Sequence, residues 1–406
     1  TKPNPNYQTV GSGNAAISVG TTYGDFVSLT YNGNAVEGAA YADGVLTFPV
    51  NIFAATDRGT EKTVVLKTTT KTANYTLTVH LFVATRVIKT TAEFEEVFRV
   101  IAASKFICGY FVLGADLDYA GNALPAPGGT VGDLSKMNGL MGTFDGRGHS
   151  IKNFNTGNAY GLFPIIKYND KSYIKNLVFE NLVHTGNKNA TIFASSMQGI
   201  TLENIVINVV QSTIPAGATM GYGYGLFASS YITKSWINNV TVNAEGQEIF
   251  SLIAPMLGSG KEATSCDNVI VNAKKVQYIG STDATPENAL TAYSGVTINQ
   301  DAVKEEITQD LYETGTTSYL VDLGVTDVEK TTSDQTTAET AALNIGTTYG
   351  DLVSLTYNEN AVEGATYAEG VLTFPLGSVL NAAIAGQEST LVMKSSSDTA
   401  NYTLNI

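Results

Sequence analysis

A short pattern that occurs five times decides the fold: Ile151-Lys-Asn-Phe154, Ile174-Lys-Asn-Leu177, Leu202-Glu-Asn-Ile205, Ile237-Asn-Asn-Val240 and Cys266-Asp-Asn-Val269. Each copy has an apolar residue, a variable residue, an asparagine and a second apolar residue. Asparagine tolerates the left-handed backbone that a sharp bend requires, and stacked amides can hydrogen-bond along successive coils. The pattern therefore predicts an asparagine ladder at one corner of a parallel β-helix.

Alternating apolar residues follow the asparagines, as expected for strands with one buried face. The pairs are Leu177 and Phe179, Ile205 and Ile207, Val240 and Val242, and Val269 and Val271. Between the asparagines lies a second repeated column: Gly161-Leu-Phe-Pro164, Thr191-Ile-Phe-Ala194, Gly225-Leu-Phe-Ala228 and Ser251-Leu-Ile-Ala254. Two columns in the same order indicate stacked coils that bury their apolar faces on one another.

The Gly-Leu-Phe column and the stretch Gly142-Thr-Phe-Asp-Gly-Arg-Gly-His-Ser-Ile151 resemble the GLUG-motif β-helices of bacterial surface proteins. The resemblance covers residues 89–329, and it departs from the family where Thr191 and Ser251 replace the expected glycine. It implies a right-handed parallel β-helix in an adhesin-like surface protein, often with Ig-like modules. It brings no shared catalytic residues.

The ends of the repeat carry sequences suited to closing the stack. Residues Thr91–Ile101 begin with a threonine followed by acids, which predicts a helix. Its apolar side chains fall at helical spacing: Phe94, Val97, Phe98 and Ile101. This helix can cap one open edge, with Tyr110–Leu113 as the first strand. At the other end, Ala302–Leu311 is compatible with a helix, and Tyr319–Leu323 is apolar enough to close the stack.

A much closer repeat flanks the central one. Residues Ser18–Pro49 return almost unchanged as Asn344–Pro375, and Thr72–Leu77 returns as Thr399–Leu404. Alternating strands separated by the turn dipeptides Asn32-Gly33 and Asp43-Gly44 predict a small Ig-like sandwich. Both copies are interpreted as spacers, and the alternative is a shared ligand-binding loop at Tyr23-Gly-Asp25 and Tyr349-Gly-Asp351.

The sequence thus predicts an all-β chain, a short right-handed parallel β-helix with a helical cap, flanked by two Ig-like β-sandwich modules. The expected boundaries are residues 1–88 for the first module, 89–329 for the capped β-helix, 330–340 for a polar linker, and 341–406 for the second module.

The composition excludes several classes of binding partner. Lys and Arg total 23 against 37 Asp and Glu, and the formal charge of −14 repels nucleic acid and anionic lipid. No apolar run approaches the about 18 residues of a membrane-spanning helix. Because the chain begins without Met at a polar stretch, we expect a removed leader and an extracellular, cell-surface location. Cys108 and Cys266 are expected to be buried core residues rather than a disulfide framework.

No residue pattern typical of an enzyme or a metal site is present. The histidines His80, His149 and His184 have no metal-ligand spacing, and no G-x-S-x-G elbow occurs. Asp145-Gly-Arg-Gly148 lacks the strand and helix context of a phosphate loop, so we assign it, with His149, to a coil turn. We expect a non-enzymatic protein without cofactor or metal.

One enzymatic alternative stays open. The variable residue before each asparagine forms the column Lys152, Lys175, Glu203, Asn238 and Asp267. Coils stacked about 4.8 Å apart would separate Glu203 and Asp267 by roughly 10 Å. That is near the carboxylate separation of inverting glycosidases. The simpler interpretation is a solvated face of mixed charge.

The candidate ligand-binding residues are Tyr222, Tyr224 and Trp236, because flat aromatic faces stack on sugar rings. Trp236 precedes the inward Ile237, so alternation places it on the outer face. The alternative is that these rings pack beneath a long loop. The expected function is an adhesin-like, glycan-binding scaffold whose partner is an extracellular glycan or a host or matrix surface protein. A glycan-cleaving enzyme and a purely structural stalk segment are the alternatives.

Overall fold

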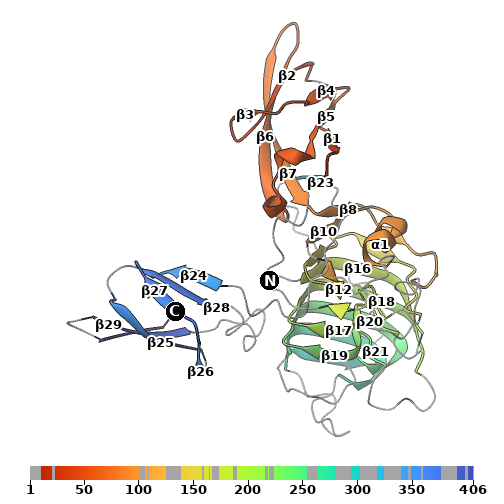
Figure 1. The fold of residues 1–406 in the computed structure, drawn as a ribbon. Coiled ribbons are helices and arrows are strands. Elements are labelled where there is room, and N and C mark those ends of the chain that lie inside the picture. The colour runs from red at the N-terminus through yellow and green to blue at the C-terminus, as the bar shows by residue number, and fades with distance from the viewer. Residues whose placement is uncertain are drawn as a thin grey trace.

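The computed structural model describes residues 11–20, 23–99, 106–107, 109–124, 139–157, 160–163, 165–166, 173–185, 190–214, 218, 224–253, 264–279, 294–301, 318–323, 340–345, 349–357, 360–375, 391–397 and 401–405. Strands dominate these residues, and the α-helix among them is α1 (Thr91–Phe98) (Figure 1). None of their helices is long and apolar enough to cross a membrane. The prediction of an all-β chain is confirmed.

The described residues between 86 and 301 form the central stack, in which parallel strands from successive coils lie side by side (Figure 1). Its long sheet runs in the order β22 (Val296–Gln300), β21 (Ser265–Tyr278), β20 (Trp236–Ser251), β18 (Thr201–Ser212), β16 (Tyr173–His184), β13 (Thr143–Asp145), β10 (Tyr110–Leu113) and β8 (Arg86–Ile88), with β14 (Ser150–Lys152) between β11 (Leu117–Asp118) and β16. A second sheet runs β19 (Ala228–Thr233), β17 (Ala194–Gln198), β15 (Ile165–Ile166), β12 (Gly139–Leu140) and β9 (Phe106–Ile107). From β15 to β20 the chain alternates between the two sheets, one coil after another.

A ladder of asparagine amides joins four coils at one corner. Asn176, Asn204, Asn239 and Asn268 all have left-handed backbone, with φ of 47–53°. The Nδ2 of each donates to the coil before it, and the amide–amide distances are 3.1, 2.7 and 3.0 Å. The ladder starts at Asp145, whose Oδ1 accepts from Asn176 Nδ2 at 3.0 Å. The predicted asparagine ladder is confirmed at these four positions.

The prediction is wrong for the fifth asparagine, Asn153. The strand β14 pairs with the second half of β16, so Ile151 lies beside Phe179 and not beside Ile174. Asn153 belongs to another ladder, in which it donates to Asp118 at 2.8 Å and accepts from Asn181 at 3.1 Å. Both corners need a left-handed residue followed by an inward apolar residue, so the local pattern does not distinguish them.

A third ladder escaped the sequence analysis. Its amides donate in the same direction as the first, with distances of 2.9, 3.0 and 2.8 Å, and belong to Asn208, Asn243, Asn272 and Asn299. None of the four has positive φ. They lie within regular strands, so the bend signal that marks the first ladder is missing from their surroundings.

The interior of the stack is apolar and continuous from coil to coil. The backbone N–H of Leu162 donates to Ile192 O at 2.8 Å, and that of Ile192 donates to Leu226 O at 2.8 Å. This confirms the Gly-Leu-Phe column as a stacked position. Cys266 is partly buried against this core, and Cys108 lies outside the described residues.

The helix α1 covers one end of this core. Thr90 Oγ1 accepts the backbone N–H of Glu93, and Glu93 Oε2 accepts the backbone N–H of Thr90 at 3.0 Å. This capping box fixes where the helix begins. Phe94 lies 5.8 Å from the Phe144 ring, and Phe98 lies 4.9 Å from the Phe163 ring. The predicted helix is confirmed over Thr91–Phe98, where it packs on this core, and Ile101 lies outside the described residues.

The two modules fold in the same register. In the first, β1 (Asn14–Ser18), β5 (Val45–Pro49) and β4 (Ala40–Ala42) form one sheet, and β7 (Asn74–Ala84), β6 (Thr60–Thr69), β2 (Asp25–Tyr31) and β3 (Asn34–Ala35) belong to the other. The second copy repeats them as β24 (Thr340–Asn344), β28 (Val371–Pro375) and β27 (Thr366–Ala368), and as β30 (Asn401–Asn405), β29 (Leu391–Ser396), β25 (Asp351–Tyr357) and β26 (Asn360–Ala361). Ile17 pairs with Leu46, and Leu343 pairs with Leu372 in the same way.

The strand β23 (Tyr319–Asp322) corrects a further prediction. Instead of closing the far end of the stack, it pairs in parallel with β7, and Val321 and Leu323 are buried in the core of the first module. Arg86 Nε lies 3.5 Å from Asp322 Oδ2. The alternating burial along β23 is typical of an edge strand with one buried face, and not of a cap on the stack. The segment 302–311 lies outside the described residues.

Replacing Asn239 by alanine should destabilise the stack by about 2–4 kcal/mol, because it removes two amide bonds and puts alanine in left-handed backbone. Asn239→Gly should recover part of the loss, since glycine accepts this conformation. The neighbouring Asn238→Ala, with one bond of 3.4 Å and no positive φ, serves as control in urea unfolding. Equal stability of the three variants would contradict a structural ladder.

Val321→Ala should destabilise the first module by about 1–3 kcal/mol, because it removes buried methyl groups from the core that β23 completes. Hydrogen exchange should rise in residues 81–84, which pair with β23. The same change at Val353, which is 64% exposed, should leave stability nearly unchanged. If exchange in residues 81–84 stays at its wild-type rate, the pairing of β23 is not what stabilises that segment.

Candidate ligand-binding face

One row of the long sheet carries an aromatic ring on every second strand. The pairing registers place these residues in a single row: Tyr110, Thr143, Tyr173, Thr201, Trp236 and Ser265. Neighbouring strands lie about 4.8 Å apart, so the positions of Tyr173 and Trp236 are separated by about 9.6 Å along the stack. The row crosses the strands and follows the axis of the stack.

Alternation along each strand puts this row on the outer face. The next residues, Ile174 and Ile237, are fully buried in the core, so Tyr173 and Trp236 point the other way. Both rings are partly exposed. Thr201, the residue between them in the row, is buried, as expected for a small side chain flanked by two large ones.

A polar row runs parallel to the aromatic one, two residues further along each strand. It consists of Asp145, Lys175, Glu203, Asn238 and Asp267. Lys175 Nζ lies 5.6 Å from the Tyr173 ring centroid, and Asn238 Nδ2 donates to Glu203 Oε1 at 3.4 Å. Hydrogen-bonding groups therefore flank the rings.

The structure corrects two expectations about the column of variable residues that precede the asparagines. Lys152 does not belong to it, because β14 places Lys152 beside Glu180 and not beside Lys175. Glu203 and Asp267 do share the row, but Asn238 stands between them and its amide bonds to Glu203. The gap that an inverting glycosidase leaves for water is here taken by a protein side chain.

The first ring of the row is covered. Tyr110 packs against Phe82 of the first module, with ring centroids 5.3 Å apart, and its hydroxyl donates to Asp145 at 2.8 Å. The glycine at Gly59 is required there, because an added Cβ would lie 2.4 Å from the Tyr110 ring. Tyr173 and Trp236 are therefore the two rings of the row that lie away from this junction.

The structure separates the sequence candidates. Tyr222 lies outside the described residues. Tyr224 packs edge-on against Phe250 at 5.9 Å, near the end of β20, whereas Trp236 begins that strand. The partner of Trp236 in its row is Tyr173, which the sequence analysis missed. The signal was present, since both residues stand directly before the apolar residue of an asparagine repeat.

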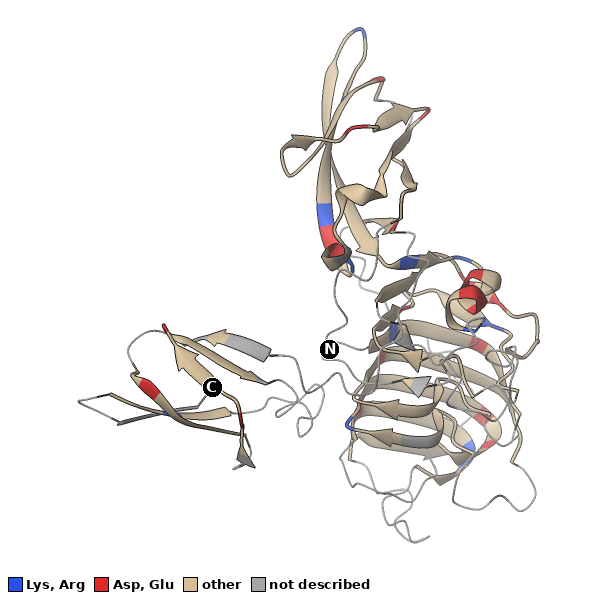
Figure 2. Ribbon diagram, in the orientation of Figure 1, with Lys and Arg blue, Asp and Glu red and all other residues tan. Residues whose placement is uncertain are grey.

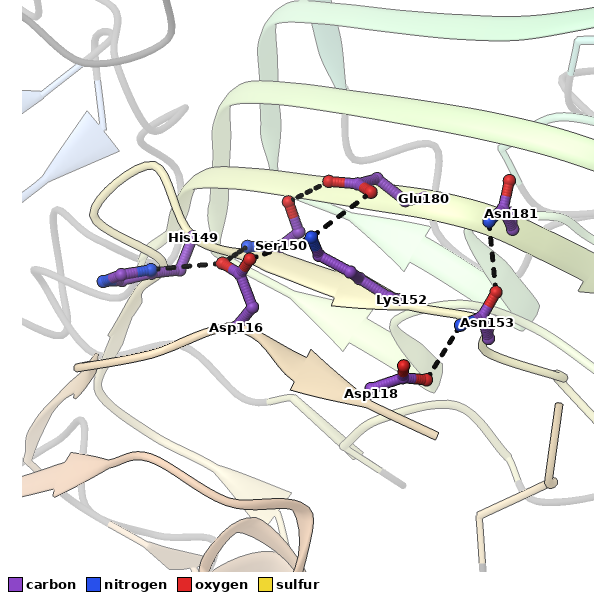
Figure 3. Close-up of polar contacts among 8 residues, drawn as sticks. All are labelled: Asp116, Asp118, His149, Ser150, Lys152, Asn153, Glu180 and Asn181. Atoms are coloured by element: carbon purple, nitrogen blue, oxygen red, sulfur yellow. Dashed lines mark hydrogen bonds and ion pairs between the residues drawn. The ribbon is translucent and has the colours of Figure 1, made fainter. Parts of the chain in front are cut away.

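A polar cluster holds the turn that contains His149 (Figure 3). Asp116 contacts His149 Nδ1 at 3.2 Å, accepts the Ser150 N–H at 3.0 Å and pairs with Lys152 at 2.9 Å. Ser150 Oγ donates to Glu180 and not to His149, so the three residue types make no nucleophilic relay. The cluster ties adjacent coils together, which agrees with a turn-stabilising role for His149.

The charged groups of this cluster shift the pKa values of their neighbours. Burial raises the pKa of Asp116, but the bonds from the Ser150 N–H, Lys152 and His149 outweigh burial and lower that pKa overall. The Asp116 carboxylate, and then Glu180, raise the pKa of Lys152.

Within the described part of the chain, no three His, Cys, Asp or Glu residues are grouped to hold a metal ion. Charge is sparse on the strands, and acidic residues mark α1 (Figure 2).

A comparison of the chain with protein-family models, with curated proteins and with solved structures finds no match in any of the three. The GLUG resemblance therefore stands on residues 142–151 and on the Gly-Leu-Phe column alone. Any inference about function has to follow from the geometry of the described residues, and the aromatic row is a candidate binding site among them.

Acid should destabilise the protein through His184, the last residue of β16. This histidine is buried, and burial lowers its pKa from 6.5 to about 4. The unfolded chain takes up the proton below about pH 6.5, whereas the folded protein takes it up only below about pH 4. Stability should fall between these values by up to about 3 kcal/mol.

His184→Asn isolates this contribution, because asparagine cannot take up the proton. The free energy of unfolding should be measured by urea titration between pH 7 and pH 4 for both proteins. All other titrating groups are common to the two, so the difference between the curves reports on His184. Parallel curves would show that His184 is not neutral and buried in the folded protein.

Proposed function

We propose that this chain is a non-enzymatic, glycan-binding scaffold that acts outside the cell or at its surface. In this proposal the central stack is a right-handed parallel β-helix that carries the binding face. The two outer modules are Ig-like sandwiches that space it. The observation that carries the proposal is the outward row with Tyr173 and Trp236 at a fixed separation, flanked by polar side chains.

Aromatic faces suit sugars because the C–H face of a sugar ring is apolar while its edge carries hydroxyl groups. A ring that stacks on the C–H face gains contact area, and the neighbouring polar row can bond the hydroxyls. In this face Lys175 and Asn238 supply donors, and Glu203 supplies an acceptor. The residues lie on paired strands and not on loops, so little ordering is needed on binding.

Several features support the parallel β-helix and the Ig-like modules of this proposal. The parallel pairing of successive coils, the alternation between two sheets and the ladders at the corners are features of a solenoid. The paired sheets of each module share one core, and the two copies keep the same register. Closely similar copies before and after the stack in the chain suit a spacer role.

Trp236→Ala and Tyr173→Ala should each weaken binding to a glycan at least tenfold, which is about 1.4 kcal/mol. A glycan array followed by titration calorimetry on a positive glycan measures this effect. Tyr224→Ala is the matched control, because Tyr224 packs against Phe250 in another part of the stack and should bind like the wild type.

Thermal unfolding of each variant checks that the fold is kept, since Trp236 and Tyr173 are only partly buried. A product assay on the bound glycan should show an unchanged chain length. Cleavage of the glycan would overturn the non-enzymatic proposal and would favour catalysis by the carboxylates of the polar row, Glu203 and Asp267. Absence of glycan binding, or full binding by both variants, would overturn the binding face and favour a structural stalk.

A further inference from the structure

We infer that the ligand of this face is a neutral, linear polysaccharide that lies along the axis of the stack and presents the same sugar face at every second residue. The inference rests on the proposed glycan-binding function and adds the class of glycan and its direction. It follows from the spacing of the two rings, from the polar row beside them and from the charges around Trp236.

The spacing selects the ligand. The rows cross the strands, so a ligand that contacts both rings must run along the stack and not along one coil. Tyr173 and Trp236 are two strands apart, about 9.6 Å. In an extended β-1,4-linked chain each sugar is turned by about half a turn relative to the last, so equal faces recur every second residue at close to this distance. A helical or branched glycan does not repeat in this way.

The polar row fits the edge of such a chain. Lys175 is on the same strand as Tyr173, Asn238 is on the same strand as Trp236, and Glu203 is on the strand between them. All three lie on the same side of the aromatic row. The sugar that falls between the two rings therefore has donors and an acceptor beside its hydroxyl groups.

Charge excludes polyanionic chains. Glu203 and Asp267 lie on the strands on either side of Asn238, and the whole chain carries a formal charge of −14. Lys175 is the cation of the polar row, and its Nζ already lies 4.0 Å from Asp145. A uronate or sulfate group near Trp236 would be repelled by these carboxylates, and a cationic sugar at Tyr173 would be repelled by Lys175, so the sugars are uncharged.

The extent of the face sets the shortest good ligand. The next ring of the row, Tyr110, is covered by Phe82, and Ser265 follows Trp236 on the other side without a ring. A ligand must reach from Tyr173 to Trp236, which requires a first and a third sugar. A disaccharide can use only one ring at a time.

Titration calorimetry of the intact chain against neutral β-1,4-linked oligosaccharides tests this inference. The glucose, mannose and N-acetylglucosamine series, from two to six sugars, are the probes. Affinity in at least one series should rise at least tenfold between two and four sugars and then level off. Trp236→Ala should remove this length dependence and leave the affinity of the disaccharide. Tyr224→Ala should keep it.

The α-1,4-linked glucose series of equal lengths is the matched control, because its chain curves, and polygalacturonate is the anionic control. Equal binding of either control would overturn the inference, while loss of that binding in Trp236→Ala would keep the proposed binding face. Affinity that does not change with length would overturn the inference in the same way. If no glycan of any class binds, both the inference and the proposed function fail.

Discussion

The structure depends on one constraint: each coil must turn at the same corners as the coil beside it, so that its strands stay paired with those of its neighbours. Left-handed backbone makes the turns, and asparagine is the residue that combines this backbone with an amide able to bond up and down the stack. The ladder through Asn204 and Asn239 satisfies both needs at once. Aspartates start two of the ladders, because a carboxylate accepts the amide N–H and needs no coil before it.

Register follows from the ladders, and the outer face follows from register. Side chains alternate across a strand, so a slip of one residue at a corner would turn Trp236 inward and Ile237 outward. With the amide of Asn239 locked between those of Asn204 and Asn268, that slip is prevented. The fixed separation of Tyr173 and Trp236 is therefore a consequence of polar contacts at the corner and not of the aromatic residues themselves.

The first module is bound to the stack more firmly than a linker would allow. The strand β7 continues almost directly into β8, and β23 returns to pair with β7. Phe82 and Tyr110 pack across the junction, and Arg147 lies over the Phe82 ring at 4.9 Å. The same contacts cover Tyr110, so the junction limits the face to Tyr173 and Trp236.

The sequence alone determined the strand periodicity, the duplicated module, the capping helix and four of the five asparagines assigned to the ladder, because each is recognised from a short local pattern of residues. It also marked Trp236 as outward. Tertiary structure alone decided that Asn153 belongs to a second corner, that residues 319–323 complete the first module, and that Tyr173 and not Tyr224 shares a row with Trp236. These facts depend on which strands pair, and pairing joins residues far apart in sequence whose local patterns are the same.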